Sequence, residues 1–193
     1  MIDMIGKGII PGIVDPDTGA AVAIEYGHSR IHAGFSFHSF ANDLDLDTDE
    51  TLTLAFKTPS GSPCAHVVPL VSASTGIRLE VLEAPTITVD TGSQIDAVNR
   101  NRNSSNLSTV ETIETVPQAG KVTLNPTITA DGLAIQNLIS GGVGAGPIKG
   151  SEGSSRDLGE LELKLDTVYA FRVTSLDDNN QVNLDLVWYE LEH

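Results

Sequence analysis

Cysteine, basic residues and aromatic residues are all scarce in this chain of 193 residues. Its one cysteine, Cys64, excludes an internal disulfide, so the chain is expected to fold without an oxidising compartment. There are 11 Lys and Arg against 26 Asp and Glu, and the net charge of −15 repels phosphate backbones, which argues against a nucleic-acid partner. No apolar run approaches the ~20 residues of a membrane-spanning helix. The N-terminus also lacks the charged start and apolar core of a signal peptide.

Familiar catalytic and ligand-binding motifs are also missing. No Gly-x-Ser-x-Gly nucleophile elbow occurs. The glycine-rich run Gly141–Lys149 does not match a phosphate-binding loop, because Pro147 stands where the lysine should follow the glycine. The acidic run Asp43–Glu50 does not lead an EF-hand, because Glu50 replaces the required glycine and Phe56 replaces the bidentate glutamate. We therefore expect no enzymatic activity, no cofactor and no metal, and interpret the acidic run as a solvated edge or turn rather than a Ca²⁺ surface.

Three histidines lie within eleven residues and raise the possibility of a cupin-like metalloenzyme. His28, His32 and His38 would share one face of a strand, and a bulge at Gly34 could break that arrangement. The His-x-His pair of a cupin is absent. Polar positions on a half-exposed strand are therefore the favoured interpretation. Cys64 is expected to be a small buried hydrophobic residue.

The chain contains stretches in which buried-type apolar residues occupy every second position. The C-terminal stretch Thr167–Glu190 holds two such runs around the polar turn Asp177–Asn180, and this predicts a long antiparallel hairpin with one buried face. In the first run Tyr169, Phe171 and Val173 share a face, opposite Val168 and Ala170. In the second run the shared face carries Val182, Leu184, Leu186 and Trp188, opposite Asn183, Asp185, Val187 and Tyr189.

Similar alternation, with turn signals every ~8–12 residues, predicts eight to ten strands in all. A short helix is expected only at Asp131–Ile139. The pattern favours an all-β fold, a jelly-roll-like antiparallel β-sandwich with long polar loops, over an up-and-down barrel. Besides the hairpin, the expected strands are Ala21–Tyr26, Arg30–Phe40, Thr51–Lys57, Cys64–Ser72, Gly76–Glu83, Thr86–Asp90, Thr109–Val116, Val122–Leu124 and Leu158–Leu165.

The predicted organisation is an extended arm over residues 1–19 followed by a single sandwich domain over residues 20–193. Within that domain, residues 91–157 form a loop-rich elaboration. The arm carries apolar Ile5, Ile9 and Ile10 among several glycines and prolines, so we expect it to lie on its own domain or on a neighbouring subunit. Arg100 and Arg102 form a local cationic cluster in an Asn-rich loop. In so acidic a chain they are candidates for contacting an acidic partner or another copy.

Four stretches resemble small structural proteins of tailed bacteriophages. They are Ile24–Phe37, Glu50–Pro59 with His66, Ala97–Ser105, and Thr167–Glu190, and the resemblance spans most of residues 22–190. It implies a virion protein of the capsid decoration, or cement, type. Such proteins often have jelly-roll-like folds and sit as dimers or trimers on the capsid exterior. The resemblance implies no catalytic residues, and the segment Ile2–Val14 departs from it.

The expected function is thus a non-enzymatic protein that binds the major capsid protein, stabilises the capsid and is assembled in the host cytoplasm. It is expected to be a homo-oligomer, a trimer or a dimer, with no nucleic-acid or membrane partner. One alternative is a head-fibre, tail or receptor-binding module that recognises cell-surface glycans. The other is the cupin-like metalloenzyme.

Overall fold

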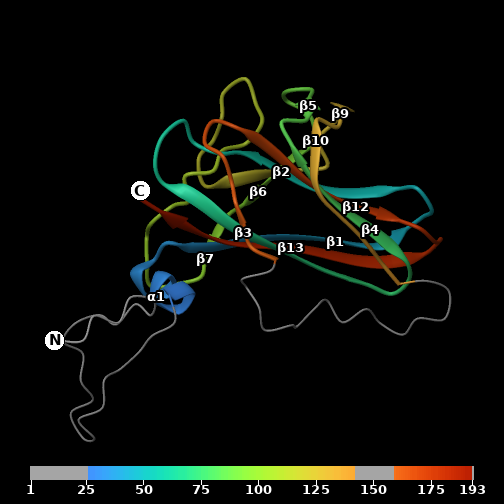
Figure 1. Ribbon diagram of the computed structural model, residues 1–193, viewed down its shortest axis with the longest axis horizontal. Coiled ribbons are helices and arrows are strands. Elements are labelled where there is room, and N and C mark those ends of the chain that lie inside the picture. Colours follow the sequence, from blue (N-terminus) through green and yellow to red (C-terminus); the bar gives the residue numbers. More distant parts are fainter. Residues whose placement is uncertain (1–25, 142–158, 193) are drawn as a thin grey trace, which may run out of the picture.

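The computed structural model describes residues 26–141 and 159–192, which fold mainly into antiparallel β-sheets. Figure 1 shows two large sheets stacked on one another, with the single described helix, α1 (Tyr26–Ala33), at the end where β7 lies. The five-stranded sheet has the order β11 (Leu161–Glu162), β3 (Cys64–Ala73), β13 (Asn180–Leu191), β1 (Ser36–Leu46), β7 (Val98–Asn99). The six-stranded sheet has the order β10 (Leu133–Ser140), β4 (Ile77–Glu83), β12 (Val168–Ser175), β2 (Thr51–Lys57), β8 (Lys121–Leu124), β6 (Ser93–Asp96). A small pair is formed by β5 (Thr86–Ile87) and β9 (Ile128–Ala130).

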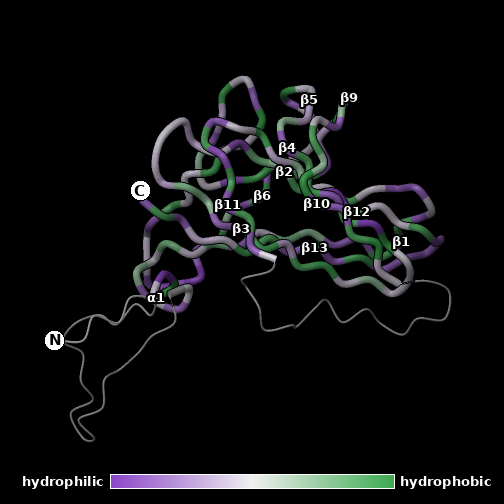
Figure 2. The backbone as a smooth tube through the Cα atoms, viewed as in Figure 1, coloured by the Kyte–Doolittle hydropathy of each residue, from purple (hydrophilic) through white to green (hydrophobic). Residues whose placement is uncertain are grey.

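The main core lies between the two large sheets. Figure 2 shows hydrophobic positions recurring along the strands that face one another. Phe37 of β1 and Phe56 of β2 each lie 6.0 Å from the Trp188 ring of β13, measured between ring centroids, and all three side chains are fully buried. Aromatic contacts of this kind add to the free energy gained by burial. The predicted all-β sandwich is confirmed.

The C-terminal runs form strands, but the predicted hairpin between them is wrong. β12 pairs with β2 and β4 in the six-stranded sheet, whereas β13 pairs with β1 and β3 in the other sheet. The connection at residues 176–179 therefore carries the chain across the core. The same crossing occurs between β1 and β2 and between β3 and β4. Alternation specifies which face of a strand is buried, and it leaves the pairing partner open.

Because consecutive strands alternate between the two sheets, the central strands of both sheets follow the same sequence of partners. The order β3-β13-β1 lies against β4-β12-β2, and the next strand outward, β11 or β10, follows on the same side. A jelly roll is likewise a double-sheet fold of eight strands with Greek-key connections. The jelly-roll topology stays a prediction, and this strand order accords with it.

The segment predicted as the start of strand Arg30–Phe40 is helical, which corrects that prediction. Helix α1 ends at Ala33 and is followed by Gly34, whose φ is +77°, a conformation that L side chains rarely adopt. The Gly34 amide donates to the Ile31 carbonyl and the Phe35 amide donates to the Arg30 carbonyl, both at 3.0 Å. These two bonds form a Schellman motif, which satisfies carbonyls at the helix end. Gly34 is thus a helix C-cap rather than a bulge, and strand β1 begins only at Ser36.

The predicted helix at Asp131–Ile139 is instead the strand β10, which pairs with β4 from Leu133 opposite Glu83 to Ser140 opposite Ile77. Leu, Ala and Gln favour helices in isolation, and pairing with a neighbouring strand overrides that preference. Three other predicted strands are shorter than expected. Thr109–Val116 contributes only isolated bridges at Glu111, Thr86–Asp90 reduces to β5, and Leu158–Leu165 reduces to β11. The prediction for Ala21–Tyr26 lies largely outside the described residues.

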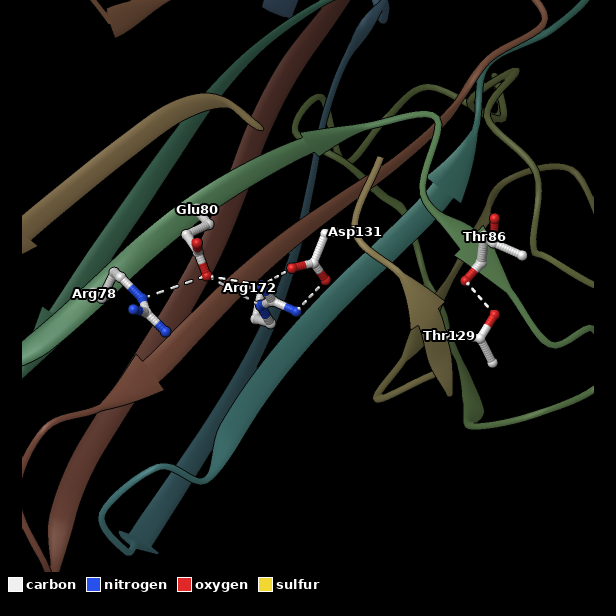
Figure 3. A network of polar contacts seen from close by, with 6 residues as sticks. All are labelled: Arg78, Glu80, Thr86, Thr129, Asp131 and Arg172. Carbon is white, nitrogen blue, oxygen red and sulfur yellow. Dashed lines mark hydrogen bonds and ion pairs between the residues drawn. The ribbon is translucent and has the colours of Figure 1, made fainter. Parts of the chain in front are cut away.

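Parts of the segment between β4 and β10, around β5, Ile113 and β9, cover the outer face of the six-stranded sheet. A second apolar cluster forms there, with Ala55 and Ala170 on adjacent strands beneath Ile113. Figure 3 shows how the end of this segment is held: Asp131 accepts hydrogen bonds from Arg172, at 2.8 Å from Nη1 and 3.1 Å from Nη2. Arg172 also donates to Glu80 at 2.9 Å. This sheet is therefore covered on both faces, as the burial of nearly every residue of β2 and β12 shows.

Candidate interaction surface

The middle of the outer face of the five-stranded sheet is not covered by any described segment, whereas Ser36 and Tyr189 at one end of that face are buried. Its strands keep the alternating pattern of a half-buried sheet, most clearly in β13, where exposed and buried residues alternate from Gln181 to Val187. Solvated sheet faces normally carry polar residues. Here the outward positions include several apolar side chains. We call this surface the open face and define it by His38, Phe40, Val68, Leu70, Asp185 and Val187.

Two rows of side chains cross the open face. In one row Asp185 of β13 lies between Phe40 of β1 and Leu70 of β3. Phe40 is 56% exposed and Leu70 is 42% exposed, so both apolar side chains remain largely in water. In the next row Val187 lies between His38 and Val68. Apolar side chains that are adjacent on a surface, rather than scattered singly, mark an interaction site.

The charges on the open face are few and partly paired. The Asp185 carboxylate lies 3.9 Å from His38 Nδ1, which is an ion-pair distance but too long for a hydrogen bond. Burial among the flanking side chains raises the pKa of Asp185, and the nearby charges of His38 and Arg100 oppose that rise. Asp185 Oδ1 is buried and accepts no hydrogen bond from the described residues.

One end of the same face is closed by a compact polar cluster. His66 and Tyr189 stack with ring centroids 4.9 Å apart and an interplanar angle of 9°. Glu160 accepts a hydrogen bond from the Tyr189 hydroxyl, and its Oε1 lies 3.0 Å from His66 Nδ1. The contacts fix the residues before β11 against β3 and β13. We interpret this cluster as structural, because the three side chains are largely enclosed and have no nucleophile beside them.

The Asn-rich loop packs beside the open face and is held by many hydrogen bonds. Asn99 Nδ2 donates to the Gly34 and Asn106 carbonyls at 2.9 and 3.0 Å, and Asn101 Nδ2 donates to the His32 carbonyl at 2.9 Å. The loop therefore supports the α1–β1 connection. Of the two predicted contact residues on this loop, Arg100 is close enough to Asp185 for its charge to oppose the rise in the pKa of that carboxyl.

Arg100 is exposed, and its amide bonds to the Ser36 carbonyl at 2.9 Å. Arg102 is exposed farther along the loop, with Nη1 3.4 Å from the Asn99 carbonyl. The structure thus places Arg100 near the open face.

A buried carboxylate fixes the next part of this loop. Glu190, at the end of β13, is 2% exposed, and its Oε1 accepts hydrogen bonds from Ser108 Oγ at 2.5 Å and the Thr109 amide at 2.9 Å. Trp188 Nε1 donates to the same Ser108 hydroxyl at 3.2 Å. Burial raises the pKa of Glu190, and these donors, which stabilise the charged form, oppose the rise. The Glu190 backbone carbonyl in turn accepts from Arg30 of α1 at 2.5 Å.

The histidines of the metalloenzyme alternative do not share a strand. His28 and His32 lie one turn apart on α1, with their Nε2 atoms 3.0 Å from each other, whereas His38 is on β1 beside Asp185. The predicted half-exposed strand position is therefore correct for His38 and wrong for the other two. Within residues 26–141 and 159–192, no group of three His, Cys, Asp or Glu is placed to hold a metal ion. Cys64 is buried at the start of β3, as predicted.

The acidic run is divided between the end of β1 and a turn. Asp43 Oδ1 accepts the Asp45 amide at 3.0 Å, and Asp47 Oδ1 accepts the Asn179 amide at 3.2 Å. Thr48 bonds through its amide and its hydroxyl to Asp178, at 3.1 and 2.6 Å. These carboxylates thus join two chain-crossing turns, which agrees with the predicted solvated turn.

Several predicted features lie outside the described residues. They include Ile5, Ile9 and Ile10 of the arm and most of the Gly141–Lys149 run. The described part of the chain has no helix long and apolar enough to cross a bilayer. The sequence interpretation missed Phe40 and Leu70, although both are large apolar residues at outward-facing positions of their strands. Their exposure can be recognised only when the strand pairing and the uncovered face of the sheet are known.

Comparisons with protein-family models, curated proteins and solved structures return no significant match for this chain. The fold and its surfaces are therefore the basis for assigning a function.

Proposed function

We propose that this protein is a non-enzymatic structural component of a tailed-phage virion that binds the outside of the capsid and stabilises it. Its partner is the major capsid protein, and the open face is the surface that docks. Assembly takes place in the host cytoplasm, which suits a chain with one free, buried cysteine.

The observation that carries this proposal is the unequal covering of the two sheets. The segments around Ile87, Ile113 and Ile128 cover the six-stranded sheet, and the five-stranded sheet keeps Phe40 and Leu70 exposed. Adjacent apolar side chains that stay exposed in the free protein are typical of a binding surface. The resemblance in Ile24–Phe37 and Thr167–Glu190 supplies the class of partner.

The net charge supports the same role. With a net charge of −15 the protein repels nucleic acid, so its binding partner is a protein surface. Many symmetric copies on a capsid also convert a modest contact into high avidity. A single open face of moderate area is sufficient for such a protein.

The test is co-sedimentation of the purified protein with capsids of the source virus. Wild-type protein is expected to sediment with capsids, and Phe40→Lys is expected to weaken binding about tenfold or more, since it replaces the large exposed aromatic side chain of the open face with a charged one. Val116→Lys is the matched control, because Val116 is 75% exposed and lies outside the open face. Equal binding by both variants, or wild-type protein that ignores capsids, contradicts the proposal.

A second variant tests the arm. Deleting residues 1–19 is expected to weaken capsid binding or self-association while the sandwich still folds, since Ile5, Ile9 and Ile10 would be lost. The glycan-binding alternative predicts surface aromatic platforms. In the described residues Phe37, Phe56, Phe171 and Trp188 are in the core, which leaves Phe35 and Phe40 as the large exposed aromatics. Hits on a glycan array, with no capsid binding, would favour that alternative.

A further inference from the structure

We propose that β10 pairs with β10 of a second copy of this chain, so that two six-stranded sheets join into one continuous antiparallel sheet across a two-fold axis. This interface is separate from the open face, which belongs to the other sheet. It is also independent of capsid binding, so each proposal can fail without the other.

The first observation is a free edge. β10 is the outermost strand of its sheet, and β4 pairs with it on one side only. Figure 1 shows it lying along that border of the sandwich. With eight residues it is the longest edge strand in the described part of the chain, since β6 has four residues and β7 and β11 have two each. An unpaired edge presents a row of backbone donors and acceptors to any strand that can align with it.

The second observation is the composition of that edge. Large apolar side chains of β10 remain in water in the single chain, with Ile139 66% exposed, Leu133 60%, Leu138 48% and Ile135 37%. No charged residue and no proline occurs in Leu133–Ser140. Natural proteins protect free edges with charges, prolines, bulges or very short strands. The register of β10 with β4 shifts between Ala134 and Gln136, and Gln136–Ser140 then pairs with β4 without interruption. The exposed edge of β3 beyond its pairing with β11 carries Pro69.

The charge pattern identifies a second copy as the occupant. A two-fold interface brings each residue close to its own equivalent, so any charge there meets a like charge. In a chain of net charge −15 an uncharged strand is therefore what self-pairing requires. A two-fold antiparallel pair sets one residue opposite its own equivalent, and Asn137 takes that position in the proposed dimer. Ile135 of one copy then lies opposite Ile139 of the other, apolar against apolar.

The side chain at the centre is also suited to self-pairing. Asn137 is exposed, and an amide can both donate and accept, so the two Asn137 side chains can bond to one another across the two-fold axis. The self-paired strand thus bonds its free backbone edge without bringing charges together.

The substitution that tests the pairing is Asn137→Lys. Asn137 is exposed and lies opposite Glu80 of β4, so a lysine there gains a counter-charge within the single chain and leaves the fold intact. Across the two-fold axis the same change brings two ammonium groups together. The matched control is Asn183→Lys, an exposed position of β13 flanked by Asn42 and Ser72, which makes the same charge change on the other sheet.

The experiment is light scattering coupled to size-exclusion chromatography on the full-length protein without capsids. We expect wild type and Asn183→Lys to run at twice the monomer mass, and Asn137→Lys to run as a monomer or to dissociate at about tenfold higher concentration or more. A monomeric wild type, a trimer, or a dimer that Asn137→Lys leaves unchanged overturns the proposal.

Hydrogen exchange of the amides of residues 133–141 supplies a second readout. Protection that decreases on about a hundredfold dilution supports pairing with a second copy, because dimerisation follows mass action. Protection that does not depend on concentration means that another part of the same chain covers the edge, and overturns it. Binding to capsids by a protein that stays monomeric would leave the proposed function intact and remove only this dimer.

Discussion

Phe56 of β2 and Trp188 of β13 stack across the interior, with ring centroids 6.0 Å apart and an interplanar angle of 29°. The two residues belong to different sheets, so their contact fixes the sheets against each other. Trp188 is fully buried and also donates from Nε1 to Ser108. A single side chain therefore joins the core to the loop that runs beside the open face.

Replacement of Trp188 should be among the most destabilising changes in the chain. Trp188→Ala is expected to lower the free energy of unfolding by about 3–5 kcal/mol, because it leaves a large cavity between the sheets. Trp188→Phe keeps an aromatic ring but loses the hydrogen bond to Ser108, and should cost about 1–3 kcal/mol. Urea denaturation followed by circular dichroism measures both. Similar losses for the two variants would mean that the hydrogen bond, rather than the packing, dominates.

The buried Glu190 gives stability an unusual pH dependence. Burial raises its pKa in the folded state above the usual 4.5, so folding favours the protonated form. Its contribution to stability is then greatest below pH 4.5 and is lost as the pH rises through the raised folded-state pKa. Glu190→Gln keeps the acceptor oxygen for Ser108 and Thr109 without the charge. The variant should be more stable than wild type at neutral pH.

That advantage should shrink as the pH falls toward 4.5, where wild-type Glu190 becomes protonated. Urea unfolding between mildly acidic and neutral pH measures the difference. Glu192→Gln is the control, since Glu192 is exposed and two residues away. An advantage for Glu190→Gln that stays constant with pH would show that titration of Glu190 is not its source.

The inward face of each major strand could be predicted from the sequence, and the pairing of the strands could not. Val182, Leu184 and Leu186 are buried as the alternation predicts, because a period of two is a local property of extended chain. Whether β13 pairs with β12 or with β1 depends on a turn that crosses the core, and the residues of a crossing turn resemble those of a hairpin. Alternation alone therefore identified the strands but mispaired the last two.

The sequence predicted a strand where helix α1 begins the Arg30–Phe40 segment and a helix where the edge strand β10 lies, and both errors have a related cause. The signal for α1 is present in Gly34, which ends the helix, but isolated glycines in apolar sequence also mark bulges. Local propensity favoured a helix in Asp131–Ile139, and the pairing of Leu133–Ser140 with β4 overrides that preference. The open face could not be predicted from the sequence, because Phe40 indicates a binding surface only once it is known that no other described segment covers it.

The link between Arg172 and Asp131 should contribute measurably to stability. Arg172 is 17% exposed and bonds to both Glu80 and Asp131, so Arg172→Met leaves two carboxylates close together without their main counter-charge. We expect a loss of about 1–3 kcal/mol in the free energy of unfolding. Arg78→Met is the matched control, because Arg78 is 40% exposed and lies 3.5 Å from Glu80, and should cost less than about 1 kcal/mol.

The Arg172→Met loss should also depend on pH. The hydrogen bond from Arg172 lowers the pKa of Asp131, so this stabilisation is present above the usual range of an aspartate and is lost as the pH falls through the lowered value. Chemical denaturation of wild type and variant at neutral and acidic pH measures it. Equal losses from Arg172→Met and Arg78→Met at neutral pH would show that the network is too solvated to matter.

Gly132 precedes β10 and should tolerate no side chain. Its φ is +69°, and a Cβ at this position would lie 2.4 Å from the Glu83 carbonyl oxygen and 2.6 Å from that of Ala84. The left-handed conformation alone costs an alanine about 1–2 kcal/mol, and the overlap with two backbone oxygens cannot be relieved by a side-chain rotation. Gly132→Ala should therefore lower the free energy of unfolding by more than that amount.

Gly61→Ala is the control, because Gly61 is exposed and a Cβ added there would have no other atom within 4 Å. Removing a glycine from such a site restricts the unfolded chain and leaves stability unchanged or raises it by up to about 1 kcal/mol. Since Gly132 sets where β10 leaves the covering segment and joins β4, Gly132→Ala should also shift β10 and weaken self-association. A variant that unfolds like wild type would show that the backbone at Gly132 can move away from Glu83 at little cost, and that the position of β10 is set by its pairing with β4 alone.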